Sequence, residues 1–428
     1  RLDVMGGIAD YSGSNVLQMT IAEAALAAAQ VRDDGVIEIV SEPEGWEFSM
    51  PAAAFYEDGF PINYPAARSV FESDSKDRWA AYVAGTLLVL AREEALNITR
   101  GVSVLIHSEV PQGKGVSSSA ALEAASMRAV LAAFGVGLEP RRTAILCQMV
   151  ENLIVGAPCG IMDQMSVICG RKGEFMSMLC QPAELGPPVA IPRSIAFWGI
   201  DSGIRHSVGG GDYGSVRTGA FMGYRIAAEI EGFEIADRII RDPHWNGYLC
   251  NIDPGDFRSR IEPHLPAAIS GADFLENYGF ITDSVTSVDP DREYAVHHPT
   301  AHPVYENGRV GVFAELIGAM GKSPPADLLG RLMYASHESY SRCGLGSDGT
   351  DLLVELVKKR ADMGLFGAKI TGGGSGGTVA VLGRRDSFDA VLDAAGEYAE
   401  LTGRDPYVFN GTSSGAAEFG LIELLPET

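Results

Sequence analysis

The spacing of apolar residues along the chain predicts its first helices and strands. Apolar, mostly β-branched residues alternate or cluster over residues 35–40 and 101–107, which is typical of strands. Between them, over residues 77–96, apolar residues recur at intervals of three and four, which favours a helix. The same patterns predict further helices over residues 140–155, 326–340 and 350–363 and a strand over residues 194–200.

A glycine–serine loop stands between a predicted strand, residues 104–106, and a helix-forming run, residues 120–134. It contains Gly113, Gly115, Ser117, Ser118 and Ser119. Unpaired N–H groups and the dipole at a helix N-terminus favour anions, and glycines let a phosphate approach closely. The serines add hydroxyl donors and a candidate Mg²⁺ ligand, although a plain serine-capped helix also fits. A Walker A motif cannot be drawn through these residues, which disfavours a P-loop kinase.

A second glycine cluster covers residues 371–379 and matches GxGxxG at Gly372, Gly374 and Gly377. A strand pattern follows it instead of a helix, so a dinucleotide-binding motif is excluded. A protein-kinase glycine loop is excluded as well, because only 51 residues follow Gly377 and the chain has no HRD or DFG sequence. The cluster therefore predicts a strand–turn–strand whose backbone packs against a ligand or a phosphate, with a plain hairpin as the alternative.

Three charged residues near glycine turns are candidate chemical groups. Asp163 follows the turn residues 159–162, and a carboxylate there can orient an attacking hydroxyl and accept its proton. Arg1 and Asp10 lie on either side of Gly6 and Gly7. Each of the three, taken alone, also fits a solvated surface position.

Composition narrows the class of protein. The 33 basic and 56 acidic residues leave a net charge of −23, which disfavours nucleic-acid and anionic-membrane partners. The longest uncharged apolar run, residues 79–91, is shorter than the roughly 18 residues of a membrane span. The six cysteines show no CxxC pair or disulfide-framework spacing, and no secretory signal is visible. We therefore expect a cytoplasmic protein with reduced thiols.

Length and proline content suggest how the chain is divided. At about 150 residues per domain, 428 residues predict two to three domains. A proline-rich stretch marks a boundary near residue 193, giving domains 1–193 and 194–428. A second polar, proline-containing stretch, residues 289–303, predicts a loop. Its histidines, His297, His298 and His302, lack further metal ligands nearby, so an ordinary loop is favoured over a metal site.

Together, these motifs resemble those of one family, the GHMP small-molecule kinases, and within it the galactokinase branch. Residues 1–11, 111–121 and 369–378 are similar to the three family signatures and occur in the same order. Residues 79–83, 159–164 and 204–207 each resemble a galactokinase stretch. The opening string is also similar to that of plant L-arabinokinases.

The resemblance implies an α+β fold with an N-terminal domain like ribosomal protein S5 domain 2, a ferredoxin-like C-terminal domain, and sugar and ATP bound between them. It implies that Asp163 is catalytic and that Arg1 assists it by charge. Mg²⁺ would be held by Glu151 and Ser119, with Ser118 as an alternative. The resemblance assigns the sugar to Gly7, Ile8, Asp10, Gly160 and Asp163, and ATP to Gly113, Gly115, Ser117, Ser118, Ser119, Gly373 and Gly374.

One departure from the family bears on the substrate. Galactokinases usually carry Glu-His where this chain has Gly7 and Ile8, and in the family that pair meets the CH₂OH group of galactose. Its loss predicts a sugar without that group, L-arabinose, phosphorylated at the anomeric hydroxyl to L-arabinose 1-phosphate. Restoring the pair as Gly7→Glu with Ile8→His is expected to narrow or reverse the preference over galactose.

Several alternatives stay open at this point. Galactokinase is the nearest of them, and a galacturonokinase would need an added cation that the first motif lacks. A non-catalytic sugar sensor on the same fold is disfavoured because Asp163, Arg1 and all three loops are retained. The oligomeric state is open, and a monomer is compatible with the sequence.

Overall fold

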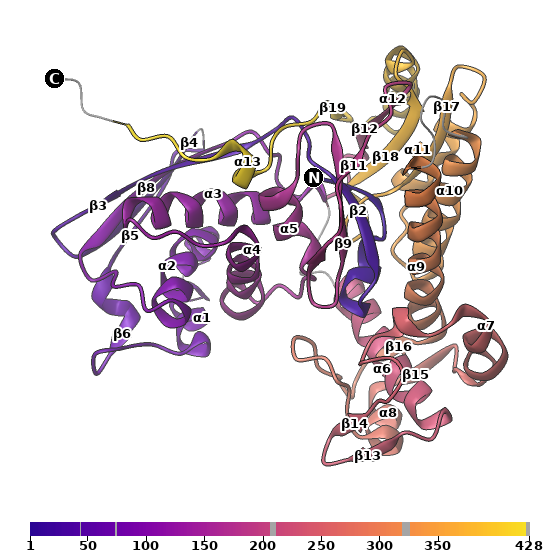
Figure 1. Cartoon of the computed structure of the whole chain (residues 1–428), viewed down its shortest axis with the longest axis horizontal. Helices are drawn as coiled ribbons and strands as arrows, with labels where there is room; N and C mark the ends of the chain where they lie inside the picture. Colours follow the sequence, from indigo (N-terminus) through magenta and orange to yellow (C-terminus); the bar gives the residue numbers. More distant parts are fainter. Residues whose placement is uncertain (43, 73–74, 206–210, 319–325, 425–428) are drawn as a thin grey trace.

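The computed structural model describes residues 1–42, 44–72, 75–205, 211–318 and 326–424 (Figure 1). Strands and helices occur in both halves of the chain, as expected for an α+β fold. Residues 206 and 207 of the galactokinase-like stretch 204–207 lie outside the described residues.

A four-stranded sheet and several helices form the N-terminal lobe, in indigo and purple in Figure 1. The strand order is β3 (Ala25–Val31), β8 (Gly101–Ser108), β4 (Val36–Glu42), β5 (Trp46–Pro51), with β4 and β8 parallel and the other neighbours antiparallel. Helices α2 (Ala81–Glu93), α3 (Ser118–Ala133), α4 (Pro140–Met149) and α5 (Met162–Cys169) share its core. Ile37 and Ile39 face that core whereas Glu38 between them is exposed, which is the alternation of a half-buried strand.

A second, antiparallel sheet lies in the middle of the molecule, where the label N marks Arg1 (Figure 1). Its order is β1 (Leu2–Met5), β2 (Asn15–Met19), β9 (Glu174–Leu179), β10 (Glu184–Leu185), with β11 (Val189–Ala190) also paired to β9. Its core joins side chains from both halves of the chain, including Leu2, Leu17 and Leu382. The first motif therefore lies at the junction of the lobes.

The C-terminal sheet has the order β17 (Leu365–Ile370), β18 (Thr378–Arg384), β12 (Ile195–Asp201), β19 (Val408–Asn410) and is antiparallel throughout. Helices α11 (Asp348–Lys358) and α12 (Phe388–Thr402) pack on it. Along the chain, strand β12, helices, β17, β18, α12 and β19 follow one another, which is the predicted ferredoxin-like βαββαβ order.

A long, mainly helical segment between β12 and β17 builds the right side of Figure 1, below the C-terminal sheet and beside it. It contains α6 (Gly211–Ile230), α7 (Pro254–Asp256), α8 (Gly271–Tyr278), α9 (His297–Gly318), α10 (Ala326–Arg342), and the hairpins β13 (Glu234–Ala236)–β14 (Ile239–Arg241) and β15 (Ala268–Ser270)–β16 (Glu293–Ala295). The remaining strands and α-helices of the described residues are β6 (Tyr56–Glu57), β7 (Phe60–Pro61), α1 (Tyr64–Glu72) and α13 (Ala416–Phe419).

The helices and strands predicted from periodicity are present, whereas one loop predicted from proline content is not. The predicted loop 289–303 is wrong, because it contains strand β16 and the first two turns of α9. Pro299 is the third residue of that helix, where no intrahelical N–H bond is needed. Pro303 lacks an N–H bond within the helix, but Ala301 and Val304 beside it are buried in an apolar core. Proline content is therefore a poor guide in this segment.

The structure also bears on the predictions about metal binding, membrane spans and cysteines. His302 is buried and its Nδ1 lies 2.7 Å from the hydroxyl oxygen of Ser339, so its ring is engaged in a protein contact. Across the described ranges, no group of three or more His, Cys, Asp or Glu side chains could hold a metal ion by itself. Within the same ranges, no helix has the length and apolar character required to span a membrane. All six cysteines are unpaired, as predicted.

Candidate active site

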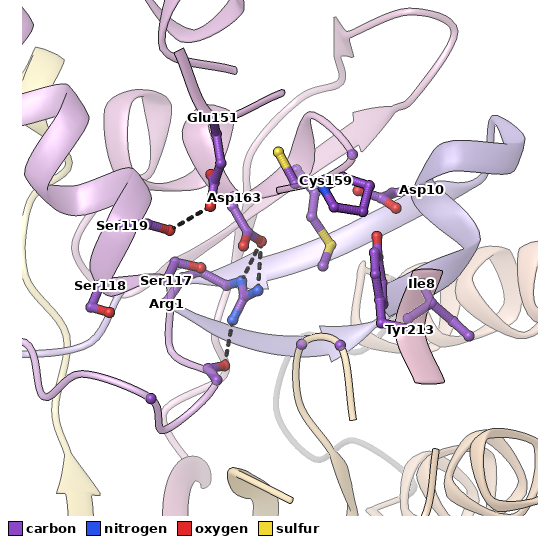
Figure 2. A pocket seen from close by; sticks show the side chains of 17 residues that line it. Arg1, Ile8, Asp10, Ser117, Ser118, Ser119, Glu151, Cys159, Asp163 and Tyr213 are labelled. Carbon is purple, nitrogen blue, oxygen red and sulfur yellow. Dashed lines mark hydrogen bonds and ion pairs between the residues drawn. The ribbon is translucent and has the colours of Figure 1, made fainter. Parts of the chain in front are cut away.

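A single cavity brings together most of the residues singled out in the sequence (Figure 2). It is lined by Arg1, Ile8, Asp10, Gly113, Gly115, Ser117, Ser118, Ser119, Glu151, Gly160, Asp163 and Gly373 from that set, together with Pro158, Cys159, Met162, Tyr213 and Gly372. Two of the selected residues, Gly7 and Gly374, do not line it. Five stretches of the chain thus converge on one site: residues 1–10, 113–119, 151–163, 213 and 372–373.

The glycine–serine loop leads directly into helix α3, as predicted. Gly113, Gly115 and Ser117 have φ values of +72°, +69° and +64°, a left-handed conformation that is uncommon for a serine. Helix α3 begins at Ser118, so its first backbone N–H groups have no intrahelical acceptors. The buried hydroxyl oxygen of Ser117 has no hydrogen-bond partner among the described residues. Free donors at the positive end of a helix dipole suit a phosphate group.

The third motif forms the predicted strand–turn–strand between β17 and β18, and its turn packs against the glycine–serine loop. A Cβ atom on Gly372 would lie 2.8 Å from the carbonyl oxygen of Gly115, and one on Gly377 would lie 2.9 Å from that of Lys114. The Thr378 hydroxyl donates a hydrogen bond to the same Lys114 oxygen at 2.8 Å. The turn therefore packs against the backbone of the glycine–serine loop and restricts its position.

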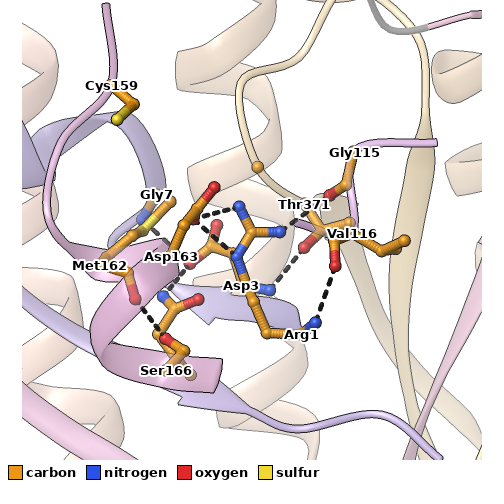
Figure 3. Close-up of polar contacts among 12 residues, drawn as sticks. Arg1, Asp3, Gly7, Gly115, Val116, Cys159, Met162, Asp163, Ser166 and Thr371 are labelled. Carbon is orange, nitrogen blue, oxygen red and sulfur yellow. Dashed lines mark hydrogen bonds and ion pairs between the residues drawn. The ribbon is translucent and has the colours of Figure 1, made fainter. Parts of the chain in front are cut away.

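Arg1 and Asp163, which both line the cavity, form an ion pair (Figure 3). The Nε and Nη2 atoms of Arg1 both donate to Asp163 Oδ1, at 2.9 and 2.5 Å, while Nη1 donates to the Gly115 carbonyl oxygen at 2.8 Å. Asp163 Oδ2 has no hydrogen-bond partner in the described part of the chain. Burial lowers the pKa of Arg1, but the charges of Asp163 and Asp3 outweigh it, so its pKa is raised and the guanidinium stays charged.

Ser119 and Glu151 meet beside this ion pair (Figure 2). The Ser119 hydroxyl donates to Glu151 Oε1 at 2.8 Å, and the Gln164 amide donates to Glu151 Oε2 at 2.6 Å. Burial, followed by the charge of Asp163, raises the pKa of Glu151 to about 7. Hydroxyl and carboxylate oxygens are the donors that Mg²⁺ prefers, and a cation would favour the ionised carboxylate. The residues present therefore fit a magnesium ion, whose other ligands would come from phosphate and water.

Two polar residues of this network were missed in the sequence. Gln164 also donates to Glu123 Oε2 at 3.2 Å, so it bridges two buried carboxyl groups. Burial and the charge of Glu151 raise the pKa of Glu123 well above its usual range. Glu123 stands one helical turn after Ser119 in an otherwise alanine-rich helix, and that spacing was an available signal.

Asp10 and Gly160 form the opposite end of the cavity. A Cβ atom on Gly160 would lie only 1.7 Å from Asp10 Oδ2, so glycine is required for this close approach. Burial and the charge of Asp163 raise the pKa of Asp10 to about 7. Tyr213 of α6 directs its hydroxyl towards Asp10, and Ile8 lies beside its ring (Figure 2). Nothing in the sequence around Tyr213 singled it out.

Arg217, one turn after Tyr213 on α6, acts on this end through its charge, which opposes the rise in the pKa of Asp10. It forms a two-pronged ion pair with Asp283, with both N–O distances at 2.8 Å, and donates to the Cys159 carbonyl oxygen at 3.1 Å. The side chains of Arg217 and Asp283 are both nearly fully buried. Arg217 thus holds the loop that carries Gly160, and its charge is already neutralised.

Comparison with known proteins identifies the family. The family models described as the GHMP kinases N terminal domain and the GHMP kinases C terminal match residues 81–171 and 318–401. An L-arabinokinase from Arabidopsis thaliana is 45% identical over 99% of this chain, and the chain spans 46% of that protein's length. A galactokinase from Chloroflexus aurantiacus is 30% identical over 94% of this chain and 87% of its own. The chain belongs to the GHMP kinase family.

A solved structure of a GHMP kinase agrees in fold. The galactokinase of Lactococcus lactis, crystallised with galactose, aligns with a TM-score of 0.73 over 97% of this chain and 92% of its own, at 21% sequence identity. The family and the two-domain α+β fold predicted from the motifs are thereby confirmed. The roles of individual residues and the boundary at residue 193 stay predictions.

Proposed function

We propose that this GHMP kinase is an ATP-dependent sugar 1-kinase that converts L-arabinose to L-arabinose 1-phosphate. The observation that supports this most strongly is the convergence of Arg1, Asp163 and the glycine–serine loop on one cavity. The L-arabinokinase at 45% identity and the galactokinase at 30% identity support a sugar as the phosphate acceptor.

In this proposal Asp163 acts on the sugar. Its Oδ1 atom is held by Arg1, which leaves Oδ2 to orient the anomeric hydroxyl and to accept its proton. The Arg1 guanidinium remains charged and would lie beside the transferred phosphoryl group. Phosphoryl transfer depends mainly on positioning and on neutralising charge, and this pair provides both.

The start of helix α3 would bind the phosphates of ATP through the loop's backbone N–H groups and the unpaired Ser117 hydroxyl. Ser119 and Glu151 would hold Mg²⁺, which when bound neutralises phosphate charge. The third-motif turn fixes the loop's backbone through its contacts with Lys114 and Gly115.

In this proposal the sugar binds at the end of the cavity formed by Asp10 and Gly160, here called the sugar end. This end favours a neutral sugar without a CH₂OH group. Asp10 offers a carboxyl group to ring hydroxyls, whereas Ile8 presents only apolar surface. Galacturonate would need a free cation, but Arg217 is already paired with Asp283. A non-catalytic sensor, the alternative of another class, has no need for an Arg1–Asp163 pair beside a phosphate-type loop.

The proposal is tested by measuring ADP release with L-arabinose, galactose and galacturonate, and by locating the phosphate on the product by ³¹P and ¹³C NMR. We expect sugar-dependent ADP release with L-arabinose and phosphate on the anomeric carbon. Asp163→Asn is the matched control, since it keeps the size of the side chain and removes the base. ADP release that no sugar stimulates, or phosphate at another carbon, would overturn the proposal.

A further inference from the structure

Gly7 faces a buried tyrosine instead of the cavity. A Cβ atom on Gly7 would lie 1.5 Å from the hydroxyl oxygen of Tyr340 and 2.7 Å from its Cζ atom. The same Cβ would lie 2.8 Å from Oδ2 of Asp3. Gly7 also has a φ of +47°, which glycine adopts most readily. Any side chain at position 7 therefore has to occupy the space that Tyr340 fills.

Tyr340, on helix α10, is held in place from several sides. It is 0% exposed, and its hydroxyl accepts a hydrogen bond from the Ile8 N–H at 2.8 Å and donates one to the Gly372 carbonyl oxygen at 3.1 Å. The Lys369 ammonium lies 5.1 Å from the ring centre, and the His302 ring packs edge-on at 5.1 Å. Because a buried hydroxyl that loses its partners is costly, Tyr340 has little freedom to move aside.

The contact with Ile8 connects Tyr340 to the cavity. Ile8 lines the sugar end, and its backbone N–H is fixed by the Tyr340 hydroxyl. The other bond of that hydroxyl ends on Gly372, which lines the same cavity from the third motif. Tyr340 itself does not line the cavity, so any influence it has on a ligand passes through these two residues.

We infer that Tyr340 is a specificity-determining positioning residue that forms a matched pair with Gly7. It fills the place of a larger side chain at position 7 and holds Ile8 at the cavity wall, so that neither position 7 nor position 8 offers a polar side chain to a CH₂OH substituent. The inference rests on the proposed function for its choice of sugars. It also revises the expectation from the sequence, because Gly7→Glu with Ile8→His cannot be accommodated while Tyr340 remains.

The activity test compares the wild type with three variants: Gly7→Glu/Ile8→His, Tyr340→Leu, and the triple variant that combines all three changes. Leucine keeps an apolar side chain and removes the ring end and hydroxyl that stand over Gly7. The double variant is expected to lose at least about tenfold in kcat/KM with both sugars. The triple variant is expected to regain at least about tenfold with galactose over the double variant, and to prefer galactose to L-arabinose.

The KM for ATP serves as the control, since it should change little between the double and triple variants. Galactose use by the double variant that equals that of the triple variant would overturn the pairing. Recovery of L-arabinose use alone in the triple variant would equally overturn it, because the pair would then have no bearing on the choice of sugar.

A stability test of the same pair does not depend on the substrate. Thermal unfolding is measured for Tyr340→Leu and for Gly7→Ala, alone and combined with Tyr340→Leu. Gly6→Ala, likewise alone and combined with Tyr340→Leu, is the matched control. A Cβ on Gly6 would meet Val16, at 2.7 Å, instead of Tyr340. Tyr340→Leu is expected to recover part of the loss in Tm caused by Gly7→Ala and none of that caused by Gly6→Ala.

Equal recovery for both glycine variants, or no recovery for Gly7→Ala, would overturn the pairing. This outcome can be told apart from a failure of the proposed function. A wild type that ignores L-arabinose would contradict the function, while the unfolding measurements would still report on Gly7 and Tyr340.

Discussion

The end of the cavity proposed to be catalytic, with Arg1, Asp163, Ser119 and Glu151, differs from the proposed sugar end in how its side chains are held. At the catalytic end they bond directly to one another, whereas at the sugar end a residue that does not line the cavity holds one of them. Arg1 contacts Asp163 and the Gly115 carbonyl oxygen directly, and Ser119 contacts Glu151. Ile8, by contrast, is held through the hydroxyl of Tyr340, which does not line the cavity. Changes at the catalytic end should therefore affect turnover, and changes behind the sugar end should affect the choice of sugar.

The largest effect is expected for Asp163→Asn. Without a carboxylate to accept the proton, kcat should fall by at least about 10²-fold, the lower range for a positioned acid–base group. Steady-state ADP release measures kcat, and calorimetric titration with L-arabinose should show that the sugar still binds. Turnover near that of the wild type would remove Asp163 from the mechanism.

Ser119→Ala and Glu151→Gln test the other pair at the catalytic end. Each removes one oxygen donor, so each should raise the Mg²⁺ concentration needed for half-maximal activity by about 10- to 100-fold. Sugar binding in the absence of nucleotide should be nearly unchanged, because neither residue touches Asp10 or Gly160. If both variants kept the Mg²⁺ dependence of the wild type, the metal site would lie elsewhere.

Arg217→Lys perturbs the sugar end from behind. Lysine cannot form the two-pronged bond to Asp283 and also hold the Cys159 carbonyl oxygen, so the loop carrying Gly160 should loosen. We expect KM for L-arabinose to rise about tenfold, equivalent to about 1.4 kcal/mol, with kcat within about threefold of the wild type. A fall in kcat at constant KM would contradict a positioning role.

Asp10→Asn predicts a smaller, pH-dependent effect on stability. The pKa of Asp10 is raised to about 7 in the folded protein, so between about pH 4 and pH 7 the unfolded chain releases a proton that the folded protein keeps. Because the folded protein binds this proton more tightly, its stability falls as the pH rises, and the loss of stability is complete above pH 7. Asparagine does not titrate, so the variant lacks this pH-dependent loss of stability. Its free energy of unfolding relative to that of the wild type should be about 1–2 kcal/mol higher at pH 8 than at pH 5, and thermal unfolding at the two pH values measures the difference.

The control for this experiment is Asp283→Asn. Burial raises the pKa of this carboxylate, but its hydrogen bonds and the charge of Arg217 outweigh burial, so its pKa is lowered. The destabilisation caused by Asp283→Asn should be largest at neutral pH and should become smaller in acid, which is the opposite pH dependence to that expected for Asp10→Asn. A pH-independent difference for Asp10→Asn would show that its carboxyl is ionised throughout this range.

The fold, and the gathering of the glycine–serine loop, Asp163 and Glu151 in one place, could be predicted from the sequence because these residues lie in contiguous motifs. The loop at residues 113–119, Asp163 and Glu151 are placed by short segments with a recognisable pattern, and all of them line one cavity. Strands and helices with clear periodicity were also found. The helix that begins at His297 was missed, because burial of its apolar face outweighs its prolines.

The sugar end was only partly predictable, since it depends on contacts between distant parts of the chain. Gly7 was read as part of the sugar site, but the structure turns it towards Tyr340, 333 positions later in the chain. Tyr213 and Arg217 come from a helix with no motif of its own. Such residues become visible only when the packing between lobes is known.

The ratio of kcat/KM for L-arabinose to that for galactose, measured on the unmodified protein, tests the central claim most directly. In the proposed sugar site, neither Gly7 nor Ile8 offers a polar side chain to the CH₂OH hydroxyl of galactose, and burying that hydroxyl unpaired costs roughly 1–3 kcal/mol. The account therefore predicts a preference for L-arabinose of about 5- to 150-fold. Equal or better use of galactose would contradict the arabinose assignment and leave a sugar kinase of another specificity.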